Sequence, residues 1–330
     1  MKLGTLKSAN LRDGQLIVVS KNNQRAIRAD HIAPSLREAI ENWAETKPAL
    51  EKLYVQLNGG QLANSFALEP AKLHAPLPRA FQWADGSAFI QHVKLVRQAR
   101  NAPLPVTLES VPLMYQGGSD RFLAPTEDIP QIDFNHGTDF EGEVGVILDD
   151  TPMGISGEDA LNKVILFVLI NDVSLRGLVA DELAQGFGFL QSKPPTAFAP
   201  FAVSVDELAG AWIEGRIHLP LHVDYNGEVF GRANAGAMHF HFGQLIAHAA
   251  RTRPLAAGTI IGSGTVSNEN LANGSSCLAE KRMLEKIHDG VIKTPFMKIG
   301  DTVKMEMLDS AGQNIFGTIE QQVAKFKNEP

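Results

Sequence analysis

The chain has 330 residues, of which 44% are hydrophobic and 20% charged, and its formal charge is −7. This length allows a large core in one or two domains, and the composition is ordinary for a soluble globular protein. The negative charge argues against nucleic acid or an anionic membrane as a partner.

The chain carries few signals of export or membrane insertion. Cys277 is the single cysteine, so no internal disulfide can form and a reducing compartment fits. The N-terminus lacks a long apolar run, and we expect no signal peptide. The longest apolar run, residues 164–170, is too short to span a bilayer. These features predict a cytoplasmic protein.

Residues 1–72 are expected to form a small N-terminal α/β domain. Asp13-Gly14 lies between two apolar stretches and predicts a hairpin. Ser35 and Glu38 form a capping box for a helix whose apolar spacing continues to Trp43. A second helix is expected over 48–57. Residues 61–80 contain several prolines and are expected to be a linker, so we place a domain boundary near residue 72.

The remaining residues, 73–330, are expected to form the larger domain. Asp85 or Ser87 can cap a helix that carries His92 and runs to about residue 100. Residues 101–130 are irregular and proline-rich, and a loop this long is usually functional. Further along, the pattern predicts a hairpin over 217–231 around Asn226-Gly227, a helix over 242–252, a strand from 256 into a glycine-rich loop at 262–265, and a strand-rich tail over 299–326.

Acidic residues lie at the ends of two predicted buried strands. Glu141 and Glu143 share one face of a strand over 140–148, roughly 7 Å apart. Asp172 ends the apolar run that follows. Buried carboxylates this close repel one another, and a hard divalent cation such as Mg²⁺ or Ca²⁺ would relieve the repulsion. Taken alone, the same pattern also fits a solvated strand face and a turn.

Several motifs together resemble those of the fumarylacetoacetate hydrolase family, over roughly residues 76–325. No motif is specific by itself, but six occur in the family's order. They are Asp85 with His92 seven positions later, Tyr115 in a glycine-containing loop, Glu141-Gly142-Glu143, the run from Asn171-Asp172 to Arg176, Ser192-Lys193, and Gly262-Ser263-Gly264-Thr265 followed by Glu280.

The resemblance implies an α+β fold, a mixed β-sandwich roll with flanking helices preceded by a small N-terminal domain, and a homodimer. It implies that Mg²⁺ or Ca²⁺ is held by Asp85, Glu141, Glu143 and Asp172. Because residues 1–72 contain no matched catalytic residue, we expect them to pack against the larger domain and shape the edge of the site.

The resemblance also assigns catalytic roles. His92 would be the general base, since an imidazole titrates near neutral pH, and Glu280 would hold its tautomer. Lys193 would assist as an electrophile near the metal. The substrate would be bound by Tyr115, Arg176, Thr265 and Ser87.

The implied activity is metal-dependent hydrolysis of a C–C bond in a small dioxo acid such as fumarylacetoacetate, in aromatic amino-acid catabolism such as tyrosine degradation. The enzymatic alternative is a hydratase, isomerase or decarboxylase of 2-oxo acids in the degradation of aromatic compounds. Two departures affect the choice of substrate. Asn101 occupies the spacing of an arginine that follows the histidine in fumarylacetoacetases, and residues 177–188 lack clear counterparts of a glutamine and a tyrosine.

Other interpretations of single residues are open to the sequence. His92 could be a structural histidine, and Lys193 could be a surface lysine before two prolines. His239, His241 and His248 suggest a zinc site, but no cysteine or well-spaced third ligand accompanies them. Cys277 is expected to be a small buried residue. A purely structural metal-binding module would leave His92, Glu280 and Lys193 without a role.

Overall fold

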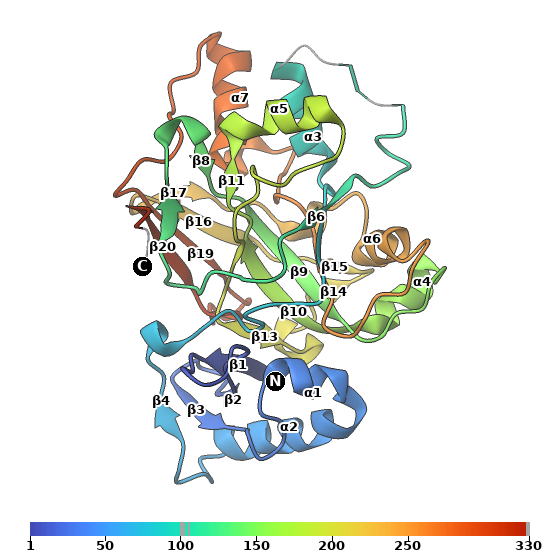
Figure 1. Cartoon of the computed structure of the whole chain (residues 1–330), viewed down its shortest axis with the longest axis vertical. Helices are drawn as coiled ribbons and strands as arrows, with labels where there is room; N and C mark the ends of the chain where they lie inside the picture. The colour runs from blue at the N-terminus through green and yellow to red at the C-terminus, as the bar shows by residue number, and fades with distance from the viewer. Residues whose placement is uncertain (100–102, 105, 328–330) are drawn as a thin grey trace.

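The computed structural model describes residues 1–99, 103–104 and 106–327, and it has an α+β fold built around one large mixed sheet (Figure 1). The strands are β1 (Lys2–Leu6), β2 (Gln15–Val19), β3 (Arg25–Arg28), β4 (Phe66–Ala67), β5 (Trp83–Gly86), β6 (Met114–Gly117), β7 (Ile129–Gln131), β8 (Thr138–Asp139), β9 (Gly142–Leu148), β10 (Val164–Asn171), β11 (Ser174–Leu175), β12 (Ala197–Phe198), β13 (Phe201–Val203), β14 (Trp212–Ile213), β15 (Arg216–Ile217), β16 (Leu221–Tyr225), β17 (Glu228–Gly231), β18 (Ile260–Gly262), β19 (Thr302–Met307) and β20 (Ile319–Lys325). The helices are α1 (Leu36–Glu41), α2 (Trp43–Asn58), α3 (Ile90–Ala99), α4 (Gly157–Ala160), α5 (Arg176–Gln185), α6 (Phe242–Ala249) and α7 (Leu278–Asp289).

The main sheet runs from the N-terminal strands into the larger domain. Its order is β4-β3-β2-β1-β13-β10-β9-β18-β5-β6, with β12 also paired to β10. The junction is the antiparallel pairing of β1 with β13, in which Lys2 lies opposite Val203. A second sheet has the order β17-β16-β19-β20-β7. The N-terminal strands therefore extend the sheet of the larger domain.

Strand β9 separates two cores because its side chains alternate between the faces of the main sheet. Val144 and Val146 belong to the core shared with the second sheet, together with Val223 of β16 and Met305 of β19. Ile147 points to the opposite face and belongs to a core shared with the N-terminal helices. This arrangement is a β-sandwich whose outer face is covered by helices.

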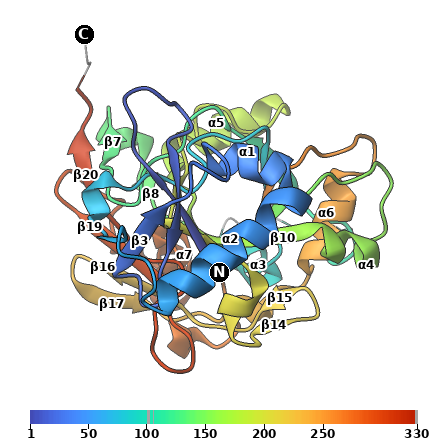
Figure 2. The same ribbon diagram turned by 90° about the horizontal axis from the view of Figure 1, so that it is seen from below.

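The N-terminal helices α1 and α2 cover the core that contains Ile147 (Figure 2). Leu36 and Ile40 of α1, and Leu50 and Leu53 of α2, are buried there against the strands of the main sheet. These helices therefore pack against the larger domain. No helix in the described part of the chain is both long enough and apolar enough to cross a membrane.

Most predicted elements agree with the structure, and the exceptions have a physical cause. Helix α2 begins at Trp43, so the predicted start at residue 48 is wrong, and Pro48 lies inside the helix. One lost backbone hydrogen bond is tolerated there because the helix buries an apolar stripe on the core. Asp85 caps no helix, because it lies in β5, which pairs with β18 and β6. Helix α3 starts at Ile90.

Three helices gather at one end of the sandwich, as the upper part of Figure 1 shows. Helix α3 packs against α7, and α5 lies at the same end of the molecule. They stand above the ends of β9 and β10 at which the acidic residues lie. This end of the sandwich holds the candidate site.

Candidate active site

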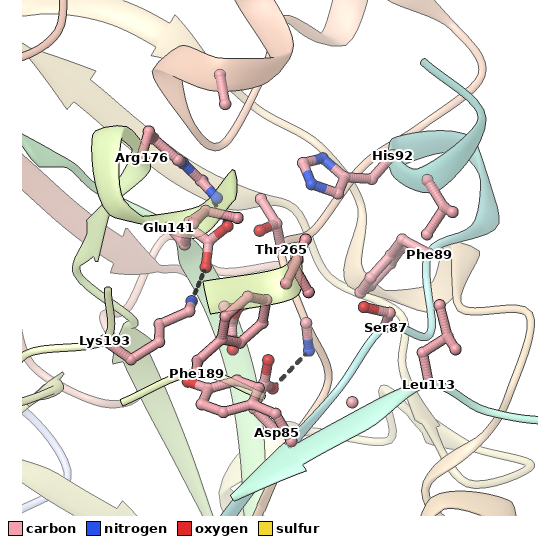
Figure 3. A pocket seen from close by; sticks show the side chains of 18 of the residues that line it. Asp85, Ser87, Phe89, His92, Leu113, Glu141, Arg176, Phe189, Lys193 and Thr265 are labelled. Carbon is pink, nitrogen blue, oxygen red and sulfur yellow. Dashed lines mark hydrogen bonds and ion pairs between the residues drawn. The ribbon is translucent and has the colours of Figure 1, made fainter. Parts of the chain in front are cut away.

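A pocket of about 340 Å³ opens beneath the three helices (Figure 3). Two residues proposed from the sequence, Asp172 and Glu280, lie behind its wall, each hydrogen-bonded to a residue that lines it. The other nine line the pocket itself: Asp85, Ser87, His92, Tyr115, Glu141, Glu143, Arg176, Lys193 and Thr265. The fold thus gathers all eleven residues in one place.

Three buried carboxylates converge at the floor of this pocket. One oxygen each of Asp85, Glu143 and Asp172 lies within 4.8 Å of the others. The pairing of β9 with β10 places Glu143 opposite Ile170, and the Asp172 amide donates to the Glu141 carbonyl at 2.9 Å. Two antiparallel strands that end side by side therefore bring the acidic residues of both together.

Asp85 reaches the same point from β5, helped by one glycine on the neighbouring strand β18 and one just after it. Gly262 lies opposite Asp85, and a Cβ at Gly262 would collide with the Asp85 carboxylate and the Trp83 ring. Gly264 has φ +76°, which favours glycine, and its amide donates to Asp85 Oδ1 at 2.9 Å. The glycine-rich loop seen in the sequence is thus a support for Asp85.

Glu143 lacks a hydrogen-bond partner although it is fully buried. Both of its carboxylate oxygens are buried and unpaired among the residues that the structure describes. An unpaired buried carboxylate is costly, and oxygen atoms from several carboxylates are the ligands that Mg²⁺, Mn²⁺ or Ca²⁺ take. The residues present therefore fit a divalent cation held by Asp85, Glu143 and Asp172.

Glu141 differs from these three, because two cations already hold it. Arg176 Nη2 donates to Glu141 Oε1 at 2.5 Å, and Lys193 Nζ donates to Glu141 Oε2 at 2.6 Å. Lys193 Nζ also donates to Asp172 Oδ2 at 2.5 Å. The group of three converging oxygens does not include Glu141, which lies beside it. Figure 3 shows Lys193 reaching Glu141 on one side of the pocket, with His92 on the opposite side.

Electrostatics divide the acidic residues into two kinds. Burial raises the pKa of Asp85 and of Glu143 well above the usual range, and neighbouring carboxylates add to the effect. Burial also opposes ionisation of Glu141, but Arg176 and Lys193 outweigh it and lower the pKa of that carboxyl. Glu141 therefore stays anionic, while the other two need a cation or a proton.

The nearby cation and phenol are held in their protonated forms. Burial disfavours a charged Lys193, but Asp172 and Glu141 outweigh it and raise the pKa of the amine. Burial and the Asp172 carboxylate raise the pKa of Tyr115 well above its ordinary value. The Tyr115 hydroxyl donates to Asp172 Oδ2 at 2.6 Å. Lys193 therefore keeps a positive charge beside the pocket, while the Tyr115 proton is held in the bond to Asp172.

His92 and Glu280 form a second constellation on the opposite wall. His92 Nδ1 lies 3.0 Å from Glu280 Oε2, and Ser267 Oγ donates to the other Glu280 oxygen at 3.1 Å. Helix α3 carries His92 and α7 carries Glu280 in its first turn. Cys277, buried as expected, caps α7. A carboxylate behind an imidazole fixes its orientation, which a general base requires.

Four residues at the site were not foreseen from the sequence. Thr196 donates to Asp172 Oδ1 at 2.7 Å, and Phe189 packs edge-on against Tyr115. Asp139 accepts from Arg176 Nε at 2.9 Å, and Arg97 lines the pocket near its apolar wall. No motif marks Thr196 or Phe189. Asp139 lies two positions before Glu141, but nothing in this spacing indicates that Asp139 binds Arg176. Asn101 lies outside the described residues.

Two family models cover nearly the whole chain. The model described as fumarylacetoacetate hydrolase C-terminal matches residues 82–324, and the one described as fumarylacetoacetase N-terminal domain 2 matches residues 1–79. The chain belongs to the fumarylacetoacetate hydrolase family. The domain boundary near residue 72 stays a prediction. The N-terminal family model ends at residue 79, and the C-terminal one begins at residue 82.

Relatives of this family member catalyse more than one kind of reaction. A 2,4-didehydro-3-deoxy-L-rhamnonate hydrolase of Sphingomonas sp. strain SKA58 is 25% identical over 69% of this chain and 69% of its own. Oxaloacetate tautomerase YisK of Bacillus subtilis strain 168 is 27% identical over 61% of this chain and 64% of its own. Membership of the family thus shows an enzyme fold used by hydrolases and tautomerases, without selecting the reaction.

A solved structure with the same fold is that of maleylpyruvate hydrolase from Sphingobium sp. SYK-6, in complex with manganese(II) and pyruvate. It superimposes with a TM-score of 0.65 at 15% identity, covering 99% of this chain and 100% of that one. At this identity the likeness shows the fold alone.

Proposed function

We propose that this protein hydrolyses a C–C bond between two carbonyl groups of a dioxo acid such as fumarylacetoacetate, giving fumarate and acetoacetate in aromatic amino-acid catabolism. The observation that carries the proposal is the pairing of two constellations across one pocket. A cluster of carboxylates lies at its floor, and the His92–Glu280 pair lies on the facing wall. Such a reaction needs electrophilic activation on one side and a base for water on the other.

Asp85, Glu143 and Asp172, with Glu141 beside them, would hold Mg²⁺ or Ca²⁺. When bound, such an ion acts as a Lewis acid that polarises the carbonyl oxygens of the substrate. The unpaired oxygens of Glu143 support this assignment. The related maleylpyruvate hydrolase, solved with manganese(II) and pyruvate, lends support from a protein of the same fold.

His92 is proposed to take a proton from the attacking water. The new C–O bond forms at one carbonyl carbon, the C–C bond breaks, and its electron pair leaves as an enolate. His92 can then return the proton to the enolate carbon, which completes the products. Glu280 holds the ring through Nδ1, which leaves Nε2 to accept the proton.

Lys193 is proposed to stabilise the enolate, and Tyr115, which lines the pocket, to contact a substrate oxygen. Lys193 stays cationic because Asp172 and Glu141 raise the pKa of its amine despite burial. A fixed ammonium beside the site stabilises negative charge on an oxygen without reorganising. Thr265 and Ser87 also line the pocket and could contact substrate oxygens.

The far wall of the pocket suits a substrate with a second carboxylate. Val93 and Arg97 line the pocket at positions i and i+4 of α3, and Phe89, directly before the helix, lines it as well. This wall is apolar near His92 and cationic at its far end. The Arg97 guanidinium donates to the Pro103 carbonyl at 2.8 Å, and no carboxylate in the described part of the chain forms an ion pair with it. Fumarylacetoacetate carries a carboxylate at each end.

A panel of substrates tests the proposal. Fumarylacetoacetate, an acylpyruvate and oxaloacetate would each be incubated with purified protein and Mg²⁺, and the products followed by NMR. We expect cleavage of fumarylacetoacetate to fumarate and acetoacetate, abolished by chelation. Absence of cleavage of every dioxo acid in the presence of bound metal would contradict the proposal.

A tautomerase or isomerase is the second candidate function. The 27% identity to an oxaloacetate tautomerase favours it, and the His92–Glu280 pair could move a proton between carbon and oxygen without water. The two candidates differ in oxygen transfer. Hydrolysis in ¹⁸O-water places ¹⁸O in the carboxylate that the reaction creates. Tautomerisation creates no new carboxylate, so no carboxylate of its product gains the label.

A further inference from the structure

Asp139 is a fully buried carboxylate for which the proposed reaction has no direct use. It lies at the end of β8, where it pairs with Ser174 of β11. Oδ1 accepts from the Leu278 amide at 2.8 Å, and Oδ2 accepts from the Ala279 amide at 2.9 Å. Oδ2 also accepts from Arg176 Nε at 2.9 Å. Both oxygens therefore accept hydrogen bonds from the protein. These bonds connect Asp139 to the start of α7 and to Arg176.

The connection to α7 leads to the proposed base. Leu278 and Ala279 begin the twelve-residue helix α7, and amides at the start of a helix have no partner within it. Asp139 supplies acceptors and a negative charge there, which the helix dipole favours. Glu280 follows directly and reaches His92. The Glu280 amide donates to Cys277 Sγ at 3.4 Å, and a thiol sulfur is a weak acceptor. Asp139 is thus the stronger anchor of this turn.

The connection to Arg176 leads to the acidic cluster. The Arg176 guanidinium donates through Nε to Asp139 and through Nη2 to Glu141 Oε1. Glu141 in turn accepts from Lys193, which also bonds Asp172. A planar guanidinium with both ends occupied holds its two carboxylates in a fixed relation. The orientation of Asp139 therefore affects that of Glu141.

We propose that Asp139 is a positioning residue that fixes the proposed base relative to the proposed metal site by anchoring the first turn of α7 and Arg176 at once. The proposal rests on the proposed function for its catalytic consequence. Asp139 does not line the pocket and acts through Arg176 and α7. The reason for such an anchor is geometric, because a misplacement of about 1 Å between reacting groups can cost about 10²-fold in rate.

The test is Asp139→Asn in the full-length protein loaded with Mn²⁺. Asparagine keeps the side-chain volume but replaces one acceptor oxygen by an NH₂ group. This group would face the Arg176 and backbone N–H groups that bond Asp139. We expect kcat to fall about 10²-fold and Mn²⁺ affinity by calorimetry to fall about 10-fold. Amide exchange at Leu278 and Ala279 should accelerate.

Double-mutant cycles separate positioning from general destabilisation. The kcat cost of Asp139→Asn should shrink in a Glu280→Gln background, and its cost in Mn²⁺ affinity should shrink in an Arg176→Gln background. Undiminished costs in both backgrounds, or wild-type kcat and Mn²⁺ affinity in Asp139→Asn, would overturn the proposal. Asp13→Asn is the matched control, because Asp13 is a buried carboxylate that bonds Arg37 and Arg79 in the N-terminal part of the chain.

Two further measurements keep the proposal testable. If Asp139→Asn does not fold, Asp139→Asn/Arg176→Gln removes both charges and leaves no buried unpaired guanidinium. That double variant must lose both kcat and Mn²⁺ affinity, and retention of either at the wild-type value would overturn the proposal. The Mn²⁺ and amide-exchange measurements need no substrate, so a failure of the proposed function on every dioxo acid is distinguishable from a failure of this inference.

Discussion

His92 Nδ1 and Glu280 Oε2 lie 3.0 Å apart although 188 positions separate them in the chain. Glu280 is almost fully buried at 1% exposure, whereas His92 reaches the pocket. The contact of α3 with α7 brings them together. A buried carboxylate that holds a partly buried imidazole in this way is the arrangement of an orienting residue and a base.

The first prediction concerns this pair as a unit. His92→Ala should lower kcat by at least about 10²-fold while Mn²⁺ binding persists, because the base is lost and the cluster of carboxylates is not. Glu280→Gln should also lose activity, and the double variant should be hardly worse than His92→Ala. Losses that multiply in the double variant would mean that the two residues act independently. His31→Ala, at an exposed histidine, is the control.

The second prediction concerns Glu143 and the metal. Glu143→Gln should weaken Mg²⁺ or Mn²⁺ binding by more than the roughly 10- to 100-fold that loss of an outer partner costs. Metal-free Glu143→Gln should be no less stable than the metal-free wild type, because a buried unpaired carboxylate becomes neutral. The rise in melting temperature on adding Mn²⁺ should be largely lost. Unchanged affinity by calorimetry would show that the site is misassigned. Glu158→Gln, on the surface, is the control.

The third prediction tests Arg97 as the partner of a second carboxylate. Arg97→Gln should raise KM for fumarylacetoacetate about 10- to 100-fold, the worth of a charge-assisted hydrogen bond. KM for an acylpyruvate with an uncharged tail should change little. Equal effects on both substrates would exclude this role. Lys94→Gln is a matched control, because it removes the same charge from α3 while Lys94 pairs with Glu109 and does not line the pocket.

The fourth prediction concerns a lysine buried between the two parts of the chain. Burial lowers the pKa of Lys2 from 10.5 to about 8, although its amine bonds Asn23 and the Asn314 carbonyl. Between pH 8 and 10.5 the unfolded chain therefore binds more protons at Lys2 than the folded chain. The contribution of Lys2 to the free energy of unfolding therefore rises by up to about 3 kcal/mol as the pH rises through this window, which stabilises the folded protein.

Urea unfolding of the wild type and Lys2→Met at pH 7.5 and pH 10 measures this effect. The wild type should gain stability relative to Lys2→Met at the higher pH, because titration of all other groups is common to both proteins. An unchanged difference would contradict the prediction. Lys7→Met, which removes an exposed amine, controls for loss of a charge.

Local chemistry made parts of this protein predictable from its sequence. The hairpin at Asn226-Gly227 formed as expected, with φ of 52° and 80°, because few other residues adopt positive φ at low cost. Ser35 accepts from the Glu38 amide as the capping box predicts. The alternating and apolar runs that form β9 and β10 placed Glu143 near the start of β9 and Asp172 directly after the end of β10. Motif order then indicated the family, which the family models confirm.

Contacts between distant segments were decided only by the tertiary structure. Strand pairing, rather than local propensity, put Asp85 into β5 beside Gly262 and started α3 at Ile90. The difference between Glu141, held by two cations, and Glu143, left unpaired, depends on where α5 and the loop after it place Arg176 and Lys193. The same holds for Asp139, whose neighbours come from α5 and α7. A sequence sets which groups can ionise or donate, but their burial and partners arise from packing between elements far apart in the chain, because a carboxylate's energy depends on what replaces its water.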